Sequence, residues 1–350
     1  MSTPPEYTPG VTYVLTNFNG RQVLPGTLAA LYRHACEIAA VIVVDDGSTD
    51  GGPAWVREHY PQVTVCGPAA NTRNVNAIRN MGLQQVRTRY AFLMDNDIAI
   101  QGGAVERLLQ VARGDPAVHC LTPRLLDADD PGRIFADGNS LHYLGLSGRA
   151  ARGLLLSERP SRPPEPTFGG GIMLVNMEAA QTVGLFDSGY LWGWGEDADY
   201  QLRGRLYGYR ALLVSDAVCL HESKQHGKDR AYAQLCNRYR LLCTVYSARS
   251  LWLLSPGLLL FEAAITVAAL MKGFWRERFA AVGHVWRERA NICRRRRELQ
   301  AHRRVRDGQL ITGGPFDLPG MMLDRPLVRF MADVLATATQ LNWRLVHRWL

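Results

Sequence analysis

The sequence lacks the short motifs that mark several large enzyme classes. It contains no GxxxxGK[ST] and no GxGxxG stretch, which argues against a phosphate-cradling P-loop and an ordinary dinucleotide site. It contains no GxSxG or HExxH stretch either. Any activity on nucleotides therefore has to come from another arrangement of residues.

The sequence also lacks paired cysteines and a signal peptide. The seven cysteines include no CxxC pair, and an odd number would leave one thiol unpaired in an oxidising compartment, so reduced cytosolic thiols are the simpler interpretation. The amino terminus, MSTPPEYTPG, has neither the basic region nor the apolar region of a signal peptide. We expect the catalytic part to lie in the cytosol.

Excess charge is absent from most of the chain. Residues 271–310 carry 12 basic and four acidic residues, a local +8 that equals the formal net charge of the whole 350-residue chain. Charge confined to one segment indicates a local anionic partner, such as a membrane surface or nucleic acid, and not a general coat for nucleic acid. The length predicts one large α/β domain with an appendage.

Apolar strand-like runs alternate with helical patterns over residues 11–120. The predicted strands are 11–19, 37–46, 62–67 and 90–97, and the predicted helices between them are 21–35, 51–60 and 76–88. Strands and helices in alternation predict a mostly parallel sheet covered on both faces, which binds ligands at the carboxyl ends of its strands.

The second half of the chain changes character twice. Residues 121–166 are rich in Pro, Gly, Asp and Arg and are interpreted as a long irregular insertion. Residues 168–184 return to strand and then helix, and 208–221 form another predicted strand. From about residue 230 the pattern is almost wholly helical. We therefore divide the chain into an α/β domain, 1–230, and a helical, basic extension, 231–350.

Two acidic pairs follow predicted strands. Asp45 and Asp46 end VIVVDD, where they can accept hydrogen bonds from a nucleobase or ribose, although a turn-and-cap motif without a ligand has the same residue types. Asp95 and Asp97 end YAFLMDND, where a turn can direct both carboxylates at one divalent cation. A hydrated polar strand end is the alternative.

A third acidic group opens a predicted helix. Glu196 and Asp197 follow the stretch WGWG, and the helix dipole would keep Asp197 ionised as a general base. Asp199 and Arg203 have the spacing of an ordinary helix-supporting ion pair. The tryptophans before them, Trp192 and Trp194, would offer flat apolar faces to a sugar ring or would be core aromatics.

Two further features end or follow strands. His221 could complete the shell of a metal beside Asp95 and Asp97, although a single histidine at a strand end is more often structural. Three glycines, Gly169 to Gly171, would let the backbone approach a ligand or would mark only a bend.

Taken in order, these stretches resemble the inverting family 2 glycosyltransferases of the GT-A fold, and within them the bacterial rhamnosyltransferase-like and galactofuranosyltransferase-like branch. The resemblance covers residues 11 to about 225. It rests on these stretches: VLTNFN, VVDDGSTDG, IRNMG, FLMDND, FGGGIMLV, GLFDSGYLWGWGEDADYQLR and CLH.

The resemblance implies a role for each matching residue. On the donor side, the residues that contact the nucleotide would be Thr16, Asp45, Asp46, Arg79 and Asp95. The ligands of Mg²⁺ or Mn²⁺ would be Asp95, Asp97 and His221. Asp197 would be the catalytic base, and the remaining binding residues would be Gly170, Gly171, Trp194 and Glu196.

One stretch departs from the branch. Many rhamnosyl and galactofuranosyl enzymes carry N-x-G-F-A-x-G-x-N where this chain has NTRNVNAIRNMG, which is closer to the general A-R-N-x-G form. The donor sugar therefore stays open, as do the nucleotide, the acceptor and the oligomeric state.

The helical tail has an apolar and a basic part. Residues 251–271 are long enough to span a bilayer, but they contain Pro256, Gly257 and Glu262. The arginine-rich stretch that follows is interleaved with aromatic residues, which favours helices lying in an anionic interface. A soluble appendage, a true span and contact of RRRR with nucleic acid are the alternatives.

We therefore expect a metal-dependent inverting glycosyltransferase at the cytoplasmic face of the cell membrane. It would move a sugar from a nucleoside-diphosphate sugar to a glycan or a lipid-linked precursor of the cell envelope or of a polysaccharide. A nucleotidyltransferase and a catalytically silent sugar-nucleotide scaffold are the rivals. We expect no nucleic-acid partner, and a homo-oligomer is compatible with the sequence.

Overall fold

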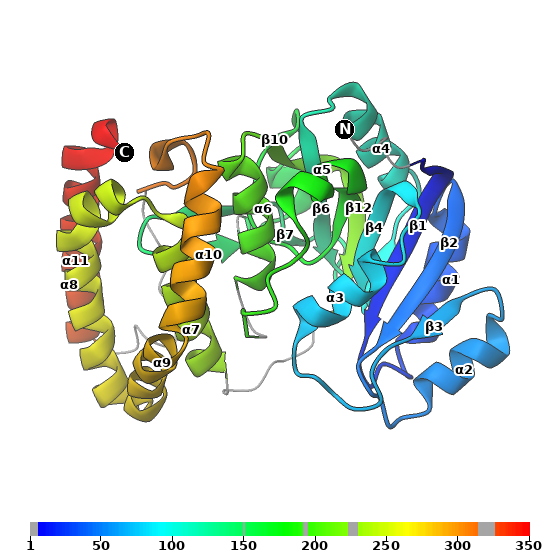
Figure 1. Cartoon of the computed structure of the whole chain (residues 1–350), viewed down its shortest axis with the longest axis horizontal. Helices are drawn as coiled ribbons and strands as arrows, with labels where there is room; N and C mark the ends of the chain where they lie inside the picture. Colours follow the sequence, from blue (N-terminus) through cyan, green and yellow to red (C-terminus); the bar gives the residue numbers. More distant parts are fainter. Residues whose placement is uncertain (1–5, 150, 192–194, 223–229, 314–325) are drawn as a thin grey trace.

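The computed structural model describes residues 6–149, 151–191, 195–222, 230–313 and 326–350. One half of the molecule is a large sheet with helices packed on it, and the other half is a group of helices from the C-terminal part of the chain (Figure 1). This arrangement matches the expected α/β fold with a helical extension.

The strands follow one another as the alternating pattern predicts over the first hundred residues. They are β1 (Thr8–Asn17), β2 (Ile38–Asp45), β3 (Thr64–Cys66), β4 (Thr88–Asp95), β5 (Ile98–Ile100), β6 (Val118–Asp127), β7 (Ile134–Ala136), β8 (Asn139–His142), β9 (Leu146–Arg149), β10 (Glu165–Pro166), β11 (Met173–Asn176) and β12 (Arg210–His221). The large sheet has the order β10-β12-β6-β11-β4-β1-β2-β3, with β5 on β12 and β7 on β6. Strands β8 and β9 pair separately.

The helices include those expected between the strands. They are α1 (Leu24–His34), α2 (Gly52–His59), α3 (Val75–Leu83), α4 (Ala104–Gly114), α5 (Met177–Val183), α6 (Glu196–Leu206), α7 (Arg230–Val245), α8 (Ala248–Lys272), α9 (Trp275–Arg287), α10 (Arg289–Ala301) and α11 (Pro326–Val346). Short 3₁₀ turns are η1 (Leu156–Glu158), η2 (Asp307–Gln309) and η4 (His347–Trp349).

The sheet is mixed but mostly parallel. Strand β1 runs parallel to β2 and β4, and β6 runs parallel to β12, whereas β11 is antiparallel to both of its neighbours. The register places Thr16 beside Val44 on one side and beside Asp95 on the other. The carboxyl ends of β1, β2 and β4 therefore meet at one edge, where a sheet of this kind binds ligands.

Two hydrophobic cores cover the two faces of the sheet. One contains the apolar side chains of α1, α2 and α4, such as Leu28, Val56 and Leu108. The other contains those of α3, α5 and α6 together with those of the C-terminal helices. All seven cysteines are free thiols, in agreement with the sequence-based interpretation.

The prediction of a long irregular insertion over residues 121–166 was wrong at the short strands β7, β8, β9 and β10 that lie inside it, and it was wrong for its first seven residues. They belong to β6, a ten-residue strand that lies between β12 and β11 and is buried along almost its whole length. The strand was missed because Pro123 and Arg124 do not fit the pattern of a buried strand. The side chain of Arg124 is 2% exposed and its Nε lies 2.8 Å from Oδ1 of the fully buried Asp137, a partner that no local pattern reveals.

The extension is helical, as predicted, and shares a core with the α/β part. In the described residues beyond Arg230 the only strand-like contact is an isolated bridge of Thr312 to His142. One core cluster joins Tyr200 of α6 with Leu241 of α7 and Leu254 of α8. A boundary near residue 230 stays a prediction, and the two segments bury apolar surface against each other.

Close packing of α3 on β1 and β2 gives a test of this fold. A Cβ at Gly82 would lie 2.4 Å from Cγ1 of Val14 and 2.9 Å from Cγ2 of Val44. We expect Gly82→Ala to lower the free energy of unfolding by about 2 kcal/mol, because overpacking outweighs the gain in helix propensity. Urea unfolding measures the difference.

Gly283 is the matched control for this substitution. It also lies inside a helix, α9, but a Cβ there would meet nothing within 4 Å. Gly283→Ala should raise the free energy of unfolding by about 0.5–1 kcal/mol through helix propensity alone. Equal effects of the two substitutions would contradict the packing argument.

Candidate active site

The carboxyl ends of β1 and β4 are joined by side chains. Thr16 Oγ1 donates a hydrogen bond to Asp95 Oδ1 at 2.7 Å. Asn96 Nδ2, one residue further, donates to Asn17 Oδ1 at 2.7 Å, and Asn17 Nδ2 donates to Asp45 Oδ1 at 2.6 Å. A continuous polar chain therefore runs along the edge at which the sequence predicts nucleotide binding.

Asp45 and Asp46 both hold turns in addition to facing this edge. Asp45 accepts hydrogen bonds from the backbone N–H of Ser48 at 2.8 Å and from its hydroxyl at 2.6 Å. Asp46 Oδ1 accepts from the backbone N–H of Thr72 at 2.8 Å. The expected turn is therefore present, but the expected helix cap is not, because α2 has Gly51 at its N-cap with no side-chain cap hydrogen bond. Asp45 Oδ1 already accepts two hydrogen bonds, so Asp45 Oδ2 and the Asp46 carboxylate are the groups that keep lone pairs for a ligand.

Arg79 is the buried cation at this edge. The residue is 3% exposed, and Nη2 lies 3.5 Å from Asp95 Oδ1. Its guanidinium also lies 5.6 Å from the ring centroid of Phe186. A Cβ at Gly171 would come within 2.2 Å of Arg79 Nη2, so only glycine lets the strand approach the guanidinium this closely.

The residues predicted to bind a metal lie around the end of β4. The backbone N–H of Glu222, the residue after His221, donates to the carbonyl of Asp97 at 3.0 Å. The His221 ring stacks on Phe135 with centroids 4.1 Å apart, and its buried Nδ1 has no hydrogen-bond partner among the described residues. Strand pairing therefore brings the two residues next to each other.

This arrangement suits a cation that takes only part of its ligands from the protein and the rest from a bound phosphate and from water. Within the described ranges, no three His, Cys, Asp or Glu side chains are close enough to form a metal site. Mg²⁺ and similar hard cations are commonly held by one or two carboxylates, with phosphate oxygens and water completing the shell. Asp95 and Asp97 would fit a site of that kind if a diphosphate completed the shell, whereas the three predicted ligands Asp95, Asp97 and His221 do not form a ready-made site by themselves.

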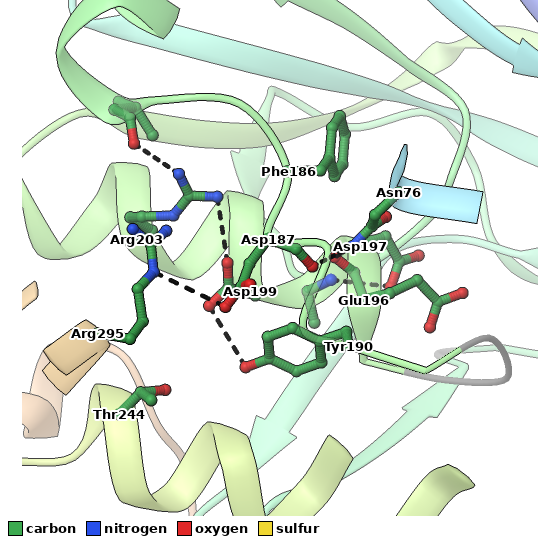
Figure 2. Close-up of polar contacts among 12 residues, drawn as sticks. Asn76, Phe186, Asp187, Tyr190, Glu196, Asp197, Asp199, Arg203, Thr244 and Arg295 are labelled. Atoms are coloured by element: carbon green, nitrogen blue, oxygen red, sulfur yellow. Dashed lines mark hydrogen bonds and ion pairs between the residues drawn. The ribbon is translucent and has the colours of Figure 1, made fainter. Parts of the chain in front are cut away.

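Asp197 lies in the first turn of α6. Its Oδ2 accepts from the backbone N–H of Gly170 at 2.5 Å and its Oδ1 from that of Ala198 at 2.8 Å. Gly170 has φ +107, which lies in the region that favours glycine. The glycine stretch thus presents an N–H that orients the carboxylate predicted to be the base (Figure 2).

Glu196, at the start of α6, has a shifted pKa. Burial, together with the negative charge of Asp197, raises the pKa of the Glu196 carboxyl to about 7, and Arg79 opposes part of this rise. Glu196 therefore holds a proton over much of the range below neutral pH. Two adjacent carboxyl groups in different environments are a common feature of acid and base chemistry.

Sequence reasoning missed Asn76. This fully buried residue donates from Nδ2 to the carbonyl of Asp187 at 3.0 Å and to that of Glu196 at 3.2 Å. The signal was present in the sequence, because Asn76, Arg79 and Asn80 have the spacing of one helix face and are polar on a helix that is otherwise largely apolar. Those three side chains face the site.

The expected pair of Asp199 and Arg203 forms, but it is not a surface pair. Arg203 Nη2 lies 3.1 Å from Asp199 Oδ2, and each side chain is 1% exposed. Arg203 Nη1 also donates to the carbonyl of Val183 at 2.6 Å. The pair therefore links α6 to the end of α5. Trp192 and Trp194, which were expected to contact a sugar ring or to be core aromatics, lie outside the described residues.

The predicted residues thus form two groups, and each group has members near Arg79. The donor-side group, at the ends of β1, β2 and β4, contains Thr16, Asp45, Asp46, Asp95 and Asp97. The second group, at the start of α6 and in the glycine stretch, contains Gly169, Gly170, Gly171, Glu196 and Asp197.

The fold is that of the GT-A glycosyltransferases. A crystal structure of GalNAc-T7 with UDP, GalNAc and Mn²⁺ superimposes with a TM-score of 0.55 at 16% identity, over 71% of this chain and 51% of that one. At this identity the likeness shows the fold alone.

Sequence comparison gives the family. Residues 12–182 match the family model described as Glycosyl transferase family 2. The chain therefore carries a family 2 glycosyltransferase domain, and the family expected from the sequence motifs is confirmed.

Curated relatives are distant and partial. An N-acetylglucosaminyl-diphospho-decaprenol L-rhamnosyltransferase of Mycobacterium tuberculosis is 26% identical over 215 residues, 55% of this chain and 68% of that protein. A poly-beta-1,6-N-acetyl-D-glucosamine synthase of Staphylococcus aureus is 23% identical over 215 residues, 60% of this chain and 49% of that protein. The chain thus spans only about half the length of the synthase.

The raised pKa of Glu196 predicts a pH-dependent stability. Because the folded state keeps the proton up to about pH 7 and the unfolded state loses it near the ordinary pKa of 4.5, wild-type stability falls between these two values as pH rises. Glu196→Gln removes this titration. We expect the stability of the variant relative to wild type to rise by about 2 kcal/mol from pH 4.5 to pH 8.

Urea unfolding at the two pH values measures this change. Glu178→Gln is the matched control, because the Glu178 side chain is 57% exposed. Its stability relative to wild type should be nearly the same at both pH values. A Glu196→Gln variant that also shows no change with pH would contradict the burial argument.

Proposed function

We propose that this protein transfers a sugar from a nucleoside-diphosphate sugar to a hydroxyl of a glycan or lipid-linked precursor of the cell envelope. The observation that carries the proposal is that the glycine stretch contacts both sides of the site: the N–H of Gly170 donates to Asp197 Oδ2, and a Cβ at Gly171 would lie 2.2 Å from Arg79 Nη2 and 3.2 Å from Asp95 Oδ2. The family 2 domain supports it. The reaction is a single displacement with inversion of the anomeric carbon.

Each step of this displacement has a residue in place. The Asp197 carboxylate takes the proton of the acceptor hydroxyl, whose oxygen forms a bond to the anomeric carbon of the donor. The bond from that carbon to the phosphate oxygen breaks, and its electron pair leaves with the nucleoside diphosphate. Arg79 contributes positive charge beside Asp95, where the diphosphate would lie.

A divalent cation fits the donor side. Asp95 and Asp97 would hold it, with His221 beside them, and a bound Mg²⁺ or Mn²⁺ would neutralise charge that develops on the leaving diphosphate. The presence of Mn²⁺ in the GalNAc-T7 structure is in keeping with this proposal.

The acceptor class is proposed from the relatives. One of them is by name a rhamnosyltransferase of a lipid diphosphate and another a polysaccharide synthase. The first name describes transfer of a sugar to a lipid-linked sugar, and the second describes synthesis of a sugar polymer. An acceptor of the same kind, a growing glycan or a lipid-linked sugar, is therefore the one we propose for this chain.

Asp197→Asn tests the assignment of the base. We expect transfer to fall by at least about 100-fold, because the amide cannot take a proton, while the dissociation constant of the nucleotide stays within about threefold of wild type. A panel of nucleotide sugars with Mg²⁺, Mn²⁺ or a chelator, read as binding, transfer or slow hydrolysis, measures both the rate of transfer and the dissociation constant. Near-normal turnover by the variant would overturn the assignment.

Asp216→Asn is the control for loss of a carboxylate. Asp216 lies on β12 with a side chain that is 46% exposed, and its turnover should match wild type. The same panel separates the rival functions. Consumption of a nucleoside triphosphate with release of pyrophosphate would identify a nucleotidyltransferase, and binding of a nucleotide sugar without turnover would identify a silent scaffold.

We also propose that the extension docks on an anionic membrane surface. Most of the large apolar side chains that the described residues expose lie on its helices: Trp252, Leu259, Leu260, Val267, Leu270, Met271, Trp275, Phe279, Val282, Trp286, Val334, Leu341, Leu345 and Trp349. On α9 the spacing of Trp275, Phe279, Val282 and Trp286 forms one stripe. Exposed arginines lie on the same helices, as expected of an interfacial helix.

Docking on the surface suits α8 better than crossing the bilayer. Among the described helices, α8 is the one long and apolar enough to span, and length and composition alone argue only weakly for a span. Its Glu262 accepts hydrogen bonds from Arg238, from Arg278 at 2.6 Å and from the Tyr239 hydroxyl at 2.8 Å. A span would place this charged cluster at the bilayer centre, where it is costly.

Co-sedimentation with vesicles tests this surface. We expect binding to vesicles that contain anionic lipid, weakened at least about fivefold when salt rises from 50 to 500 mM, because exposed charges are screened. The double variant Phe279→Ser, Trp286→Ser should lose binding. Phe18→Ser, which alters an exposed aromatic on the α/β half, should retain it. Binding that ignores both salt and the double variant would contradict the proposal.

A further inference from the structure

The loop between α5 and α6 is held by the C-terminal extension. Asn237 of α7, which is 1% exposed, makes two hydrogen bonds to the backbone of Leu191: the N–H of Leu191 donates to its Oδ1 at 2.8 Å, and its Nδ2 donates to the carbonyl at 2.6 Å. Two reciprocal bonds fix the position of the backbone at one residue. Leu191 is only a few residues before Asp197.

A buried ion pair holds the same loop further back. Arg240, one helical turn after Asn237, donates from Nε at 3.0 Å and from Nη2 at 2.8 Å to Asp187 Oδ2. The two side chains are 10% and 11% exposed, and Arg295 of α10 lies 3.7 Å from the same carboxylate. Burial raises the pKa of the Asp187 carboxyl, but Arg240, the N–H of Gly189 and Arg295 together lower it by more, so the group stays ionised.

The loop packs tightly against this guanidinium. A Cβ at Gly189 would lie 2.2 Å from Arg240 Nη2, and the N–H of Gly189 donates to Asp187 Oδ1 at 2.8 Å. A planar guanidinium that contacts both a carboxylate and the adjacent backbone has little freedom to move. The loop therefore takes its position from α7.

The opposite side of the loop is attached to the donor half. Asn76 donates to the carbonyls of Asp187 and Glu196, and Asn80 exchanges two hydrogen bonds of 2.9 Å with the backbone of Phe186. Tyr190 then donates to Asp199 Oδ1 at 3.3 Å, on the helix that carries Asp197 (Figure 2). The loop lies between α3 on one side and α7 on the other.

From these contacts we propose that Arg240 and Asn237 are positioning residues for Asp197. They act through Asp187 and Leu191, and they set the distance between the start of α6 and the donor edge. The helical extension thus builds the acceptor half of the site in addition to any membrane contact. This inference rests on the proposed glycosyl transfer.

The chemistry explains why such positioning matters. A general base must lie within hydrogen-bond reach of the hydroxyl that it deprotonates, and a misplacement of about 1 Å can lower the rate about 100-fold. Donor binding depends on the edge formed by β1, β2 and β4, which Arg240 does not contact through any hydrogen bond in the described part of the chain. Loss of the contacts that Arg240 and Asn237 make with the loop should therefore reduce transfer and leave nucleotide binding unchanged.

Arg240→Gln tests the inference, and Arg238→Gln is its matched control. The two arginines lie two residues apart on α7, are both buried and each pair with a carboxylate, but Arg238 pairs with Glu262 of α8. Both variants lose a buried ion pair. Gly189→Ala is a third variant, which keeps every charge and displaces only the guanidinium.

We expect Arg240→Gln to lower kcat for transfer about 10- to 100-fold, with nucleotide affinity within about threefold of wild type. Hydrolysis of the donor by water should fall less than transfer does. Gly189→Ala should show the same pattern more weakly. Arg238→Gln, compared at a temperature equally far below its own Tm, should keep kcat within about threefold of wild type.

Hydrogen exchange gives a readout that does not depend on turnover. Backbone amides of residues 186–191 should exchange at least about tenfold faster in Arg240→Gln than in Arg238→Gln, while those at the ends of β1 and β2 should be unchanged. The double variant Asp187→Asn, Arg240→Gln should be no slower in transfer than the slower of its two single variants, because the two residues act as one unit.

Two results would overturn the inference. The first is that kcat falls in Arg240→Gln only as far as the loss of Tm explains, as it does in Arg238→Gln. The second is that hydrogen exchange of residues 186–191 is unchanged in Arg240→Gln. Failure of the proposed function has a different signature, because wild type itself would then turn over no nucleotide sugar. In either case the exchange measurement shows whether Arg240 holds residues 186–191 in place.

Discussion

The site depends on a buried guanidinium that stands among carboxylates. Arg79 is 3% exposed, lies 3.5 Å from Asp95, and is the main group that opposes the upward pKa shift of Glu196. Without a cation there, the acidic groups at the start of α6 and at the end of β4 would repel one another across a partly buried space. Gly171 is glycine because any larger residue would displace this guanidinium.

The C-terminal helices are part of the catalytic architecture in this view. One face of α7 packs in the core with α6, another exchanges hydrogen bonds with the loop before Asp197, and a third pairs with Glu262 of α8. The exposed apolar stripe of α9 lies on the same helical group. A lipid-linked acceptor held at a membrane surface would thus meet a base whose position the surface-facing helices also influence.

Local patterns predicted the strand-helix alternation and the acidic strand ends, but they failed where a contact is long-range. The irregular segment expected from residue 121 is partly a central strand, because Arg124 finds Asp137 and can be buried. Asn76 was missed because an asparagine in a helix has no obvious partner until the loop at Asp187 is in place. The pair of Asp199 and Arg203 was predicted correctly, yet its burial came from packing against α5 and the loop.

The sequence by itself determined the family, the fold class and the types of residue at each strand end, because periodicity and short motifs depend on neighbours along the chain. Only the tertiary structure decided what each charge pairs with. Asp187 and Arg240 are 53 residues apart in the sequence, and no local rule assigns one to the other. Packing removes both Asp187 and Arg240 from water, and each charge then compensates the other. Arg79 is buried in the same way, and its contact with the partly exposed Asp95 also depends on how the strands and helices pack.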